Sequence, residues 1–157
     1  MHVVKLYAQL QVLLDDVLNW NRSADLDTPS FSQRMVSAFL ASGELPDQLA
    51  ILRSEYRMRR DAMLSALDRH LAGAVRWNRP TAGMFIWLEM PERIDTAQLV
   101  RSAIEEEQVA FSPGMAFAVR GSRHASHCMR LAFANHTPEQ IDEGIGRLAR
   151  VIERALR

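Results

Sequence analysis

Apolar residues recur at intervals of three and four along much of the chain, and this spacing predicts helices. Local signals mark several helix ends: Ser42-Gly43 and Gly73 end two helices, and Thr137 with Gln140 forms a capping box at the start of the last. Asp95 and Gln98 are expected to form a second capping box. The predicted helices cover residues 3–20, 31–41, 46–72, 95–107 and 138–156.

Short apolar runs after residue 73 predict four strands, over residues 74–77, 84–89, 109–111 and 128–134. Both alternating sets of residues in the second run are apolar, so both of its faces are expected to be covered. The resulting order, β-β-α-β-β-α, predicts a sheet of three or four strands packed against helices. We therefore expect an α+β fold with an α-rich N-terminal segment.

Composition narrows the picture to a soluble globular protein. The 157 residues are 48% apolar and 24% charged, and the formal net charge is zero. A neutral chain argues against nucleic acid or an anionic membrane as the main partner, and no apolar run reaches the roughly 20 residues of a membrane helix. The single cysteine, Cys128, excludes an intrachain disulfide and suits the cytoplasm. Eighteen arginines stand beside one lysine, Lys5.

The strongest candidate for chemistry is Arg130, which lies in the middle of the last predicted strand. Strand alternation places Met129, Leu131 and Phe133 on one face and Arg130 on the other. A guanidinium on a core strand needs an anion, and its planar fork matches a carboxylate. From the residues alone, the more common arrangement is an internal ion pair with Glu89 or with one of residues 105–107; a bound carboxylate ligand is the alternative.

Four motifs carry a family resemblance. They are Tyr56-Arg-Met-Arg-Arg-Asp61, Pro80-Thr-Ala-Gly83-Met-Phe85, Pro113-Gly114 and Met129-Arg130-Leu-Ala-Phe133. In this order and spacing they resemble the C-terminal small domain of fold-type I, pyridoxal-phosphate-dependent aminotransferases of class I/II. The similarity is greatest to the branch of aminoadipate-type transaminases and MocR regulators.

The resemblance implies an organisation and two substrate contacts. Residues 1–20 would be a poorly matching N-terminal helix, residues 21–72 the interdomain and interface segment, and residues 73–157 the small domain. In the family, the arginine at the position of Arg130 binds the α-carboxylate of an amino acid or 2-oxo acid. Arg22 falls near an arginine that reads the distal carboxylate of acidic substrates in some members, although a solvated loop arginine is the simpler interpretation.

One glycine of the family signature is replaced, because Ala82 stands where its first glycine is usual. A simple bend before a buried strand explains the motif equally well.

The resemblance also implies pyridoxal phosphate in the complete family protein, held on a lysine of a preceding large domain. Lys5 has none of the sequence around that lysine, so we expect no cofactor binding, no catalytic residue and no transaminase activity from this chain alone. A zinc site built from His124, His127, Cys128 and His136 is not favoured.

Three interpretations remain open. The chain is the small domain of an aminotransferase separated from its large domain, the end of a MocR-type ligand-sensing regulator, or a stand-alone module that self-associates through its former domain interface. A homodimer or larger oligomer is expected in each case, with no direct contact to nucleic acid or membrane.

Overall fold

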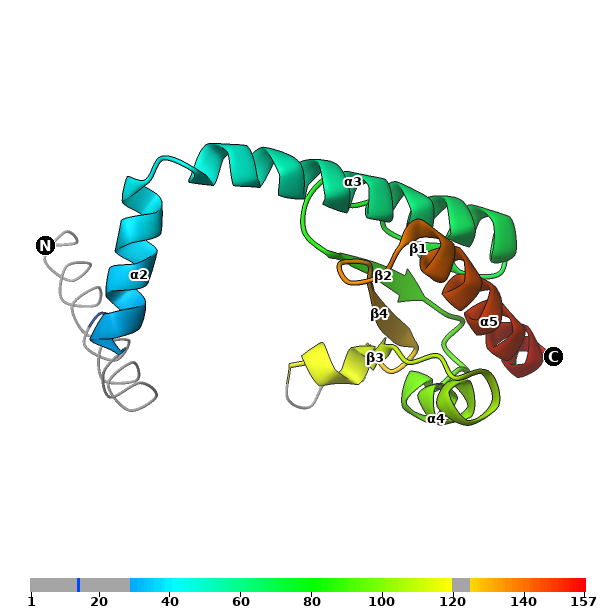
Figure 1. Ribbon diagram of the computed structural model, residues 1–157. Coiled ribbons are helices and arrows are strands. Elements are labelled where there is room, and N and C mark those ends of the chain that lie inside the picture. The colour runs from blue at the N-terminus through cyan, green and yellow to red at the C-terminus, as the bar shows by residue number, and fades with distance from the viewer. Residues whose placement is uncertain (1–13, 15–28, 120–124) are drawn as a thin grey trace, which may run out of the picture. The chain divides into compact units, whose positions relative to one another are not determined.

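The computed structural model describes residue 14 and residues 29–119 and 125–157 (Figure 1). The chain divides into two compact units, residues 1–49 and 50–157. Apart from Leu14, the predicted helix over residues 3–20 lies outside the described residues. No helix in the described ranges is both long and apolar enough to cross a membrane.

Two helices account for the described part of the α-rich segment, as the spacing predicts. Helix α2 (Ser30–Ala41) ends at Ser42, and Gly43 follows with a φ of +79°. Helix α3 (Leu45–His70) begins in the first unit and continues into the second, where it contributes Met63, Ala66 and Leu67 to the core.

The second unit contains a four-stranded antiparallel sheet in the order β1-β2-β4-β3 (Figure 1). The strands are β1 (Arg76–Trp77), β2 (Phe85–Glu89), β3 (Ser112–Pro113) and β4 (Cys128–Ala132). The expectation of an α+β fold with a small sheet is confirmed.

Helices α4 (Thr96–Glu107) and α5 (Pro138–Leu156) complete this unit, together with the short 3₁₀ helix η1 (Gly114–Phe117). Thr137 and Gln140 form the capping box that the sequence predicts for α5. At α4 the predicted box is wrong: the Asp95 side chain accepts a hydrogen bond from the Ala97 amide, and no reciprocal bond from the Gln98 side chain is present.

The core lies between the sheet and the helices. Its members are buried apolar residues from α3, α4, α5, β2 and β4 and from the segments next to them. They include Leu67, Ile86, Leu88, Leu99, Met129, Leu131, Phe133, Ile145, Leu148 and Ile152.

The prediction that both faces of the second strand are covered is wrong. Ile86 and Leu88 are buried, but Phe85 is 39% exposed and Trp87 is only partly buried. The reason is that the helical residues of the core pack against the Ile86 face, which leaves the alternate set open.

The predicted strand over residues 109–111 is also wrong, because these residues follow the end of α4 and make no strand pairing. Gln108 adopts a left-handed conformation with a φ of 56°, and the Val109 amide donates to the Ala103 carbonyl. Residues 108 and 109 thus satisfy carbonyls at the end of α4, while Val109 and Phe111 pack against the core. Strand pairing starts only at Ser112.

Candidate functional site

Arg130 lies in the central strand β4, opposite Trp87 of β2 on one side and Ser112 of β3 on the other. Its neighbours Met129 and Leu131 are buried in the core, so the Arg130 side chain belongs to the open face of the sheet. Arg130 itself is partly buried. The strand therefore fixes the backbone of Arg130 on both sides, while its side chain remains accessible.

Two aromatic rings cover the guanidinium of Arg130. The Cζ atom lies 3.9 Å from the ring centroid of Phe85 and 4.0 Å from that of Phe117. Phe117 in turn meets Trp87 edge to face, with ring centroids 6.1 Å apart and planes at 70°. A cation held over an aromatic ring gains about 0.5–1 kcal/mol where the site is exposed. The open face therefore has a small aromatic cluster organised around one cation.

The carboxylates named as internal partners of Arg130 are either engaged elsewhere or form no pair with it. Glu89 pairs with Arg76 at 3.0 Å, and Glu107 pairs with Arg150 at 2.6 Å. Within the part of the chain that the structure describes, no hydrogen bond or ion pair joins the Arg130 guanidinium to a carboxylate. The internal ion pair that the residues alone favoured is not present there.

Gly114 permits the close packing that positions Phe117. A Cβ atom at Gly114 would lie 2.5 Å from the Ala125 carbonyl oxygen and 2.8 Å from that of Cys128, distances that side chains do not tolerate. The backbone at the start of η1 can therefore lie directly against the segment that enters β4. This contact gives the Pro113-Gly114 pair a physical role: it brings η1, and with it Phe117, to the central strand.

In the loop before β2, position 83 requires a glycine, and a glycine is present there. Gly83 has a φ of +85°, whereas Ala82 does not have a positive φ. The backbone here thus accepts alanine at position 82 without strain, and the bend depends on Gly83.

The start of β4 is held by Thr96, a residue that sequence reasoning did not single out. Its side chain is fully buried, and Oγ1 lies 2.7 Å from the Cys128 carbonyl oxygen and 3.0 Å from that of Ser126. Its backbone amide also donates to Ser126. The only sequence signal is its place directly after the helix-capping Asp95.

The end of β4 is held by Arg59 of α3, which belongs to the Tyr56–Asp61 motif. One terminal nitrogen of Arg59 donates to the carbonyl of Ala134, and the other lies 3.4 Å from Glu55. The motif thus connects α3 to the residues just beyond the strand that carries Arg130. Arg59 itself is partly buried.

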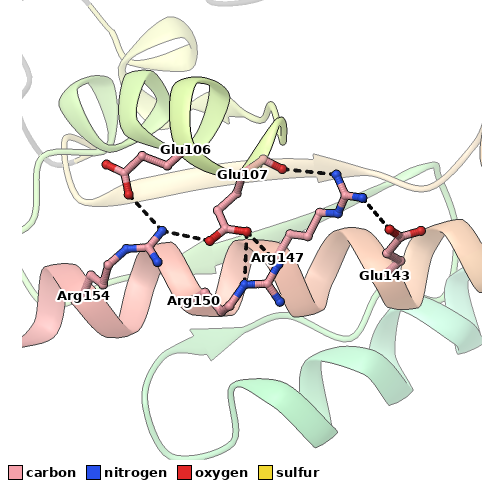
Figure 2. A network of polar contacts seen from close by, with 6 residues as sticks. All are labelled: Glu106, Glu107, Glu143, Arg147, Arg150 and Arg154. Atoms are coloured by element: carbon pink, nitrogen blue, oxygen red, sulfur yellow. Dashed lines mark hydrogen bonds and ion pairs between the residues drawn. The ribbon is translucent and has the colours of Figure 1, made fainter.

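A cluster of charged residues, separate from the Arg130 site, joins α4 to α5 (Figure 2). Glu107 accepts hydrogen bonds from Arg150 and Arg154, and these bonds lower its pKa to about 2. Arg147 pairs with Glu143 and also donates to the Glu107 carbonyl. A hollow of about 470 Å³ lies beside this cluster, and Arg130 does not line it. The charges are mutually paired, which indicates a structural role.

The thiol of Cys128 is buried, and this burial raises its pKa. A thiol that resists ionisation is a poor nucleophile, so Cys128 acts as a small core residue. Among the described residues, no group of three or more His, Cys, Asp or Glu side chains could hold a metal ion. Arg22, Lys5 and His124 lie outside the described residues.

The second unit is a small α+β domain, and its Arg130 has no carboxylate partner among the described residues. Comparison with known proteins shows the family to which the chain belongs. The model of the family "Aminotransferase class I and II" matches residues 7–148. The chain therefore belongs to the class I and II aminotransferase family.

Individual relatives agree with this assignment. The 2-aminoadipate transaminase of Thermus thermophilus is 38% identical over 140 residues, which are 89% of this chain and 34% of the relative. An uncharacterised HTH-type transcriptional regulator of Bacillus subtilis, YdfD, is 27% identical over 82% of this chain and 26% of its own length. The chain spans about a third of the length of the curated aminotransferases it matches.

The fold agrees as well. The crystal structure of the α-aminoadipate aminotransferase LysN from Thermus thermophilus, complexed with N-(5'-phosphopyridoxyl)-L-leucine, superimposes with a TM-score of 0.80 at 37% identity. The match covers 92% of this chain and 36% of that chain.

Full-length members of this family use pyridoxal phosphate. The described residues contain no lysine, and they therefore offer no amine for a Schiff base with that cofactor.

Proposed function

We propose that this chain is the substrate-binding small domain of a pyridoxal-phosphate-dependent class I/II aminotransferase, and that Arg130 binds the α-carboxylate of an amino acid or 2-oxo acid. One observation carries the proposal. The Arg130 guanidinium lies over the rings of Phe85 and Phe117 and has no carboxylate partner among the described residues. The edge of the guanidinium, with its N–H groups, is the part that a planar carboxylate can engage in a bidentate manner.

The role of this chain would be to bind and orient, without forming or breaking bonds. In complete members of the family, pyridoxal phosphate supplies the electron sink for amino-group transfer. Since the described residues offer no lysine to hold it, we assign them no step through the cofactor. We expect the 157-residue chain to be inactive alone, to act in the cytoplasm as a dimer or larger oligomer, and to carry its small domain in residues 73–157.

Leucine and leucinamide provide a direct test, because they differ only at the carboxylate. The chain would be labelled with ¹⁵N-arginine and titrated with each compound while the Arg130 Nε–H signal is followed by NMR. We expect leucine, and not leucinamide, to shift that signal. Substituting Arg130→Lys keeps the charge but loses the fork. This variant lacks the Arg130 signal, so its leucine affinity would be measured by isothermal titration calorimetry, and we expect it to be about tenfold weaker.

Arg76→Lys is the matched control for this test. Arg76 belongs to the same sheet, but its side chain is 86% exposed and pairs with Glu89. Its substitution should leave leucine binding unchanged. Equal affinity of the Arg130→Lys variant and the original chain would contradict the assignment.

A second candidate is the ligand-sensing half of a MocR-type regulator, which the similarity to the HTH-type regulator YdfD supports. The carboxylate site would then detect an amino acid instead of presenting it for reaction. Arg22 would belong to the same site in either protein if it reads a distal carboxylate. The DNA upstream of Met1 discriminates between the two: a winged helix-turn-helix reading frame indicates the regulator, and a large domain with a Schiff-base lysine indicates the enzyme.

A third candidate is a stand-alone module that self-associates. The open face of the sheet and its surroundings expose Phe85, Phe117 and Met115, which are 39%, 46% and 40% exposed. Apolar surface of this kind drives association when it lacks its usual cover. Light scattering would test this: a chain that stays monomeric at high concentration argues against the module.

A further inference from the structure

The surroundings of Arg130 carry an inference beyond the contact with a carboxylate. We infer that Phe85 and Phe117 form an aromatic clamp, a pair of positioning residues that hold the Arg130 guanidinium in one fixed orientation before any ligand arrives. This inference builds on the proposed function, because it explains why the carboxylate site is ready-made.

The two rings approach Arg130 from independent elements. Phe85 is the first residue of β2, and its place next to β4 is set by the pairing of Phe85 with Ala132. Phe117 is the last residue of η1, which Gly114 brings against the entry to β4. The Cζ atom lies at nearly equal distances from the two centroids, 3.9 and 4.0 Å. Both rings are therefore in direct contact with the guanidinium, and each is anchored by a different part of the chain.

The clamp has a role because Arg130 has nothing else to hold it among the described residues. Arginine side chains have about 2 kcal/mol of rotamer entropy to lose when they bind a ligand. Most other arginines of this unit are fixed by carboxylates or carbonyls, as Arg150 is by Glu107. Aromatic rings can restrain a guanidinium without occupying its N–H groups, because they contact its faces. Among the described residues no hydrogen bond or ion pair occupies the N–H groups of Arg130, so they stay free for a carboxylate while the rings restrain the side chain.

Trp87 contributes to the restraint of Arg130 indirectly, through its contact with Phe117. It meets Phe117 edge to face, and it stands opposite Arg130 in the strand register. Phe117 is thus fixed by a contact to the strand next to β4. We expect Trp87 to act through Phe117, with a smaller effect on Arg130 than either clamp residue has.

The clamp can be measured without ligand in the full 157-residue chain. NMR of ¹⁵N-arginine-labelled protein reports rotation of the Arg130 guanidinium about its Cζ–Nε bond, and the signal is assigned by its loss in Arg130→Lys. We expect this rotation to be about 3- to 10-fold faster in Phe117→Leu and in Phe85→Leu. Phe117→Tyr keeps a ring and should retain the slow rotation.

Phe111→Leu is the matched control. Phe111 precedes the residue that pairs with Arg130, but its side chain packs against the core and makes no ring contact with Arg130. We expect this variant to leave the rotation rate unchanged. Unchanged rotation in both Phe85→Leu and Phe117→Leu would overturn the clamp.

Ligand binding then tests whether the clamp positions Arg130. We expect leucine to bind Phe117→Leu about 3- to 10-fold more weakly and Phe117→Tyr with nearly its original affinity. Faster rotation combined with unchanged leucine affinity would overturn the positioning role. If leucine does not bind the original chain at all, the proposed function fails, while the ligand-free rotation rates decide separately for or against the clamp.

Discussion

The two faces of the sheet differ in what covers them. On the covered face, Ile86, Leu131 and Phe133 are buried beneath three helices. On the open face, Phe85 and Phe117 remain partly exposed and surround Arg130. The strands are the same, so the difference arises from alternation together with what packs against each side.

The comparison teaches that a single short strand can serve stability and recognition at once. Because successive side chains of β4 point in opposite directions, Met129 and Leu131 can fill the core while Arg130 stays available. Packing of the core-facing side chains fixes the backbone of β4. The position of Arg130 on the open face is thereby fixed as well. The comparison predicts large stability effects on one face and mainly functional effects on the other.

The largest expected effect comes from opening a cavity on the covered face. We expect Ile86→Ala to lower the free energy of unfolding by about 2–5 kcal/mol, since Ile86 is fully buried. The adjacent Phe85→Ala, on the open face, should cost about 1 kcal/mol or less. Urea unfolding of both variants would measure the difference. Equal losses would contradict the division into a covered and an open face.

The next effect concerns Gly114, at the start of η1, which lies against the segment that enters β4. We expect Gly114→Ala to lower the free energy of unfolding by about 1–3 kcal/mol, because the added methyl meets the Ala125 and Cys128 carbonyl oxygens. It should also displace Phe117 from Arg130. Gly144→Ala is the control: its Cβ would meet nothing within 4 Å, and alanine in a helix should stabilise by up to about 1 kcal/mol. A Gly114→Ala variant as stable as the original chain would refute the close packing.

A smaller effect is expected from the buried hydroxyl at the start of β4. Thr96→Val keeps the shape of the side chain but removes its hydrogen bond to the carbonyls of Ser126 and Cys128. We expect a loss of about 1–3 kcal/mol, near the lower end, because the Thr96 amide still donates to Ser126. Thr96→Ser, which keeps the hydroxyl, should restore part of it. Thermal unfolding followed by circular dichroism would compare the two.

The smallest effect is electrostatic and lies in the cluster that joins α4 to α5 on the covered side. The pKa of Glu107 is lowered to about 2 by hydrogen bonds from Arg150 and Arg154. A carboxyl whose pKa is lower in the folded state stabilises the fold above its unfolded pKa, near 4.5, and loses that contribution as the pH falls towards 2. We expect Glu107→Gln to reduce the stability change across this pH range, whereas Glu105→Gln, outside the cluster, should not. Urea unfolding at several pH values would measure it, and identical profiles for the two variants would refute the prediction.

Local patterns in the sequence were sufficient to predict most of the helices and strands. Helical spacing predicts α2, α3, α4 and α5, and the capping residues locate the start of α5 to the residue. The errors have one cause each. Residues 109–111 indicated a strand, but the Val109 amide satisfies a carbonyl at the end of α4. Both faces of β2 were expected to be covered, but helices pack against only one of them.

Alternation alone separated Arg130 from Leu131, and the motifs around them indicated the family, because these signals depend only on neighbours in the chain. The tertiary structure decided what surrounds Arg130. Phe85 and Phe117 reach it from 45 and 13 residues away in the sequence, and Glu89, the candidate partner on β2, pairs with Arg76 instead. Side-chain contacts of this kind depend on strand register and on how closely two backbones approach. The residue order within one strand determines neither of them, so these contacts could not be predicted from the sequence.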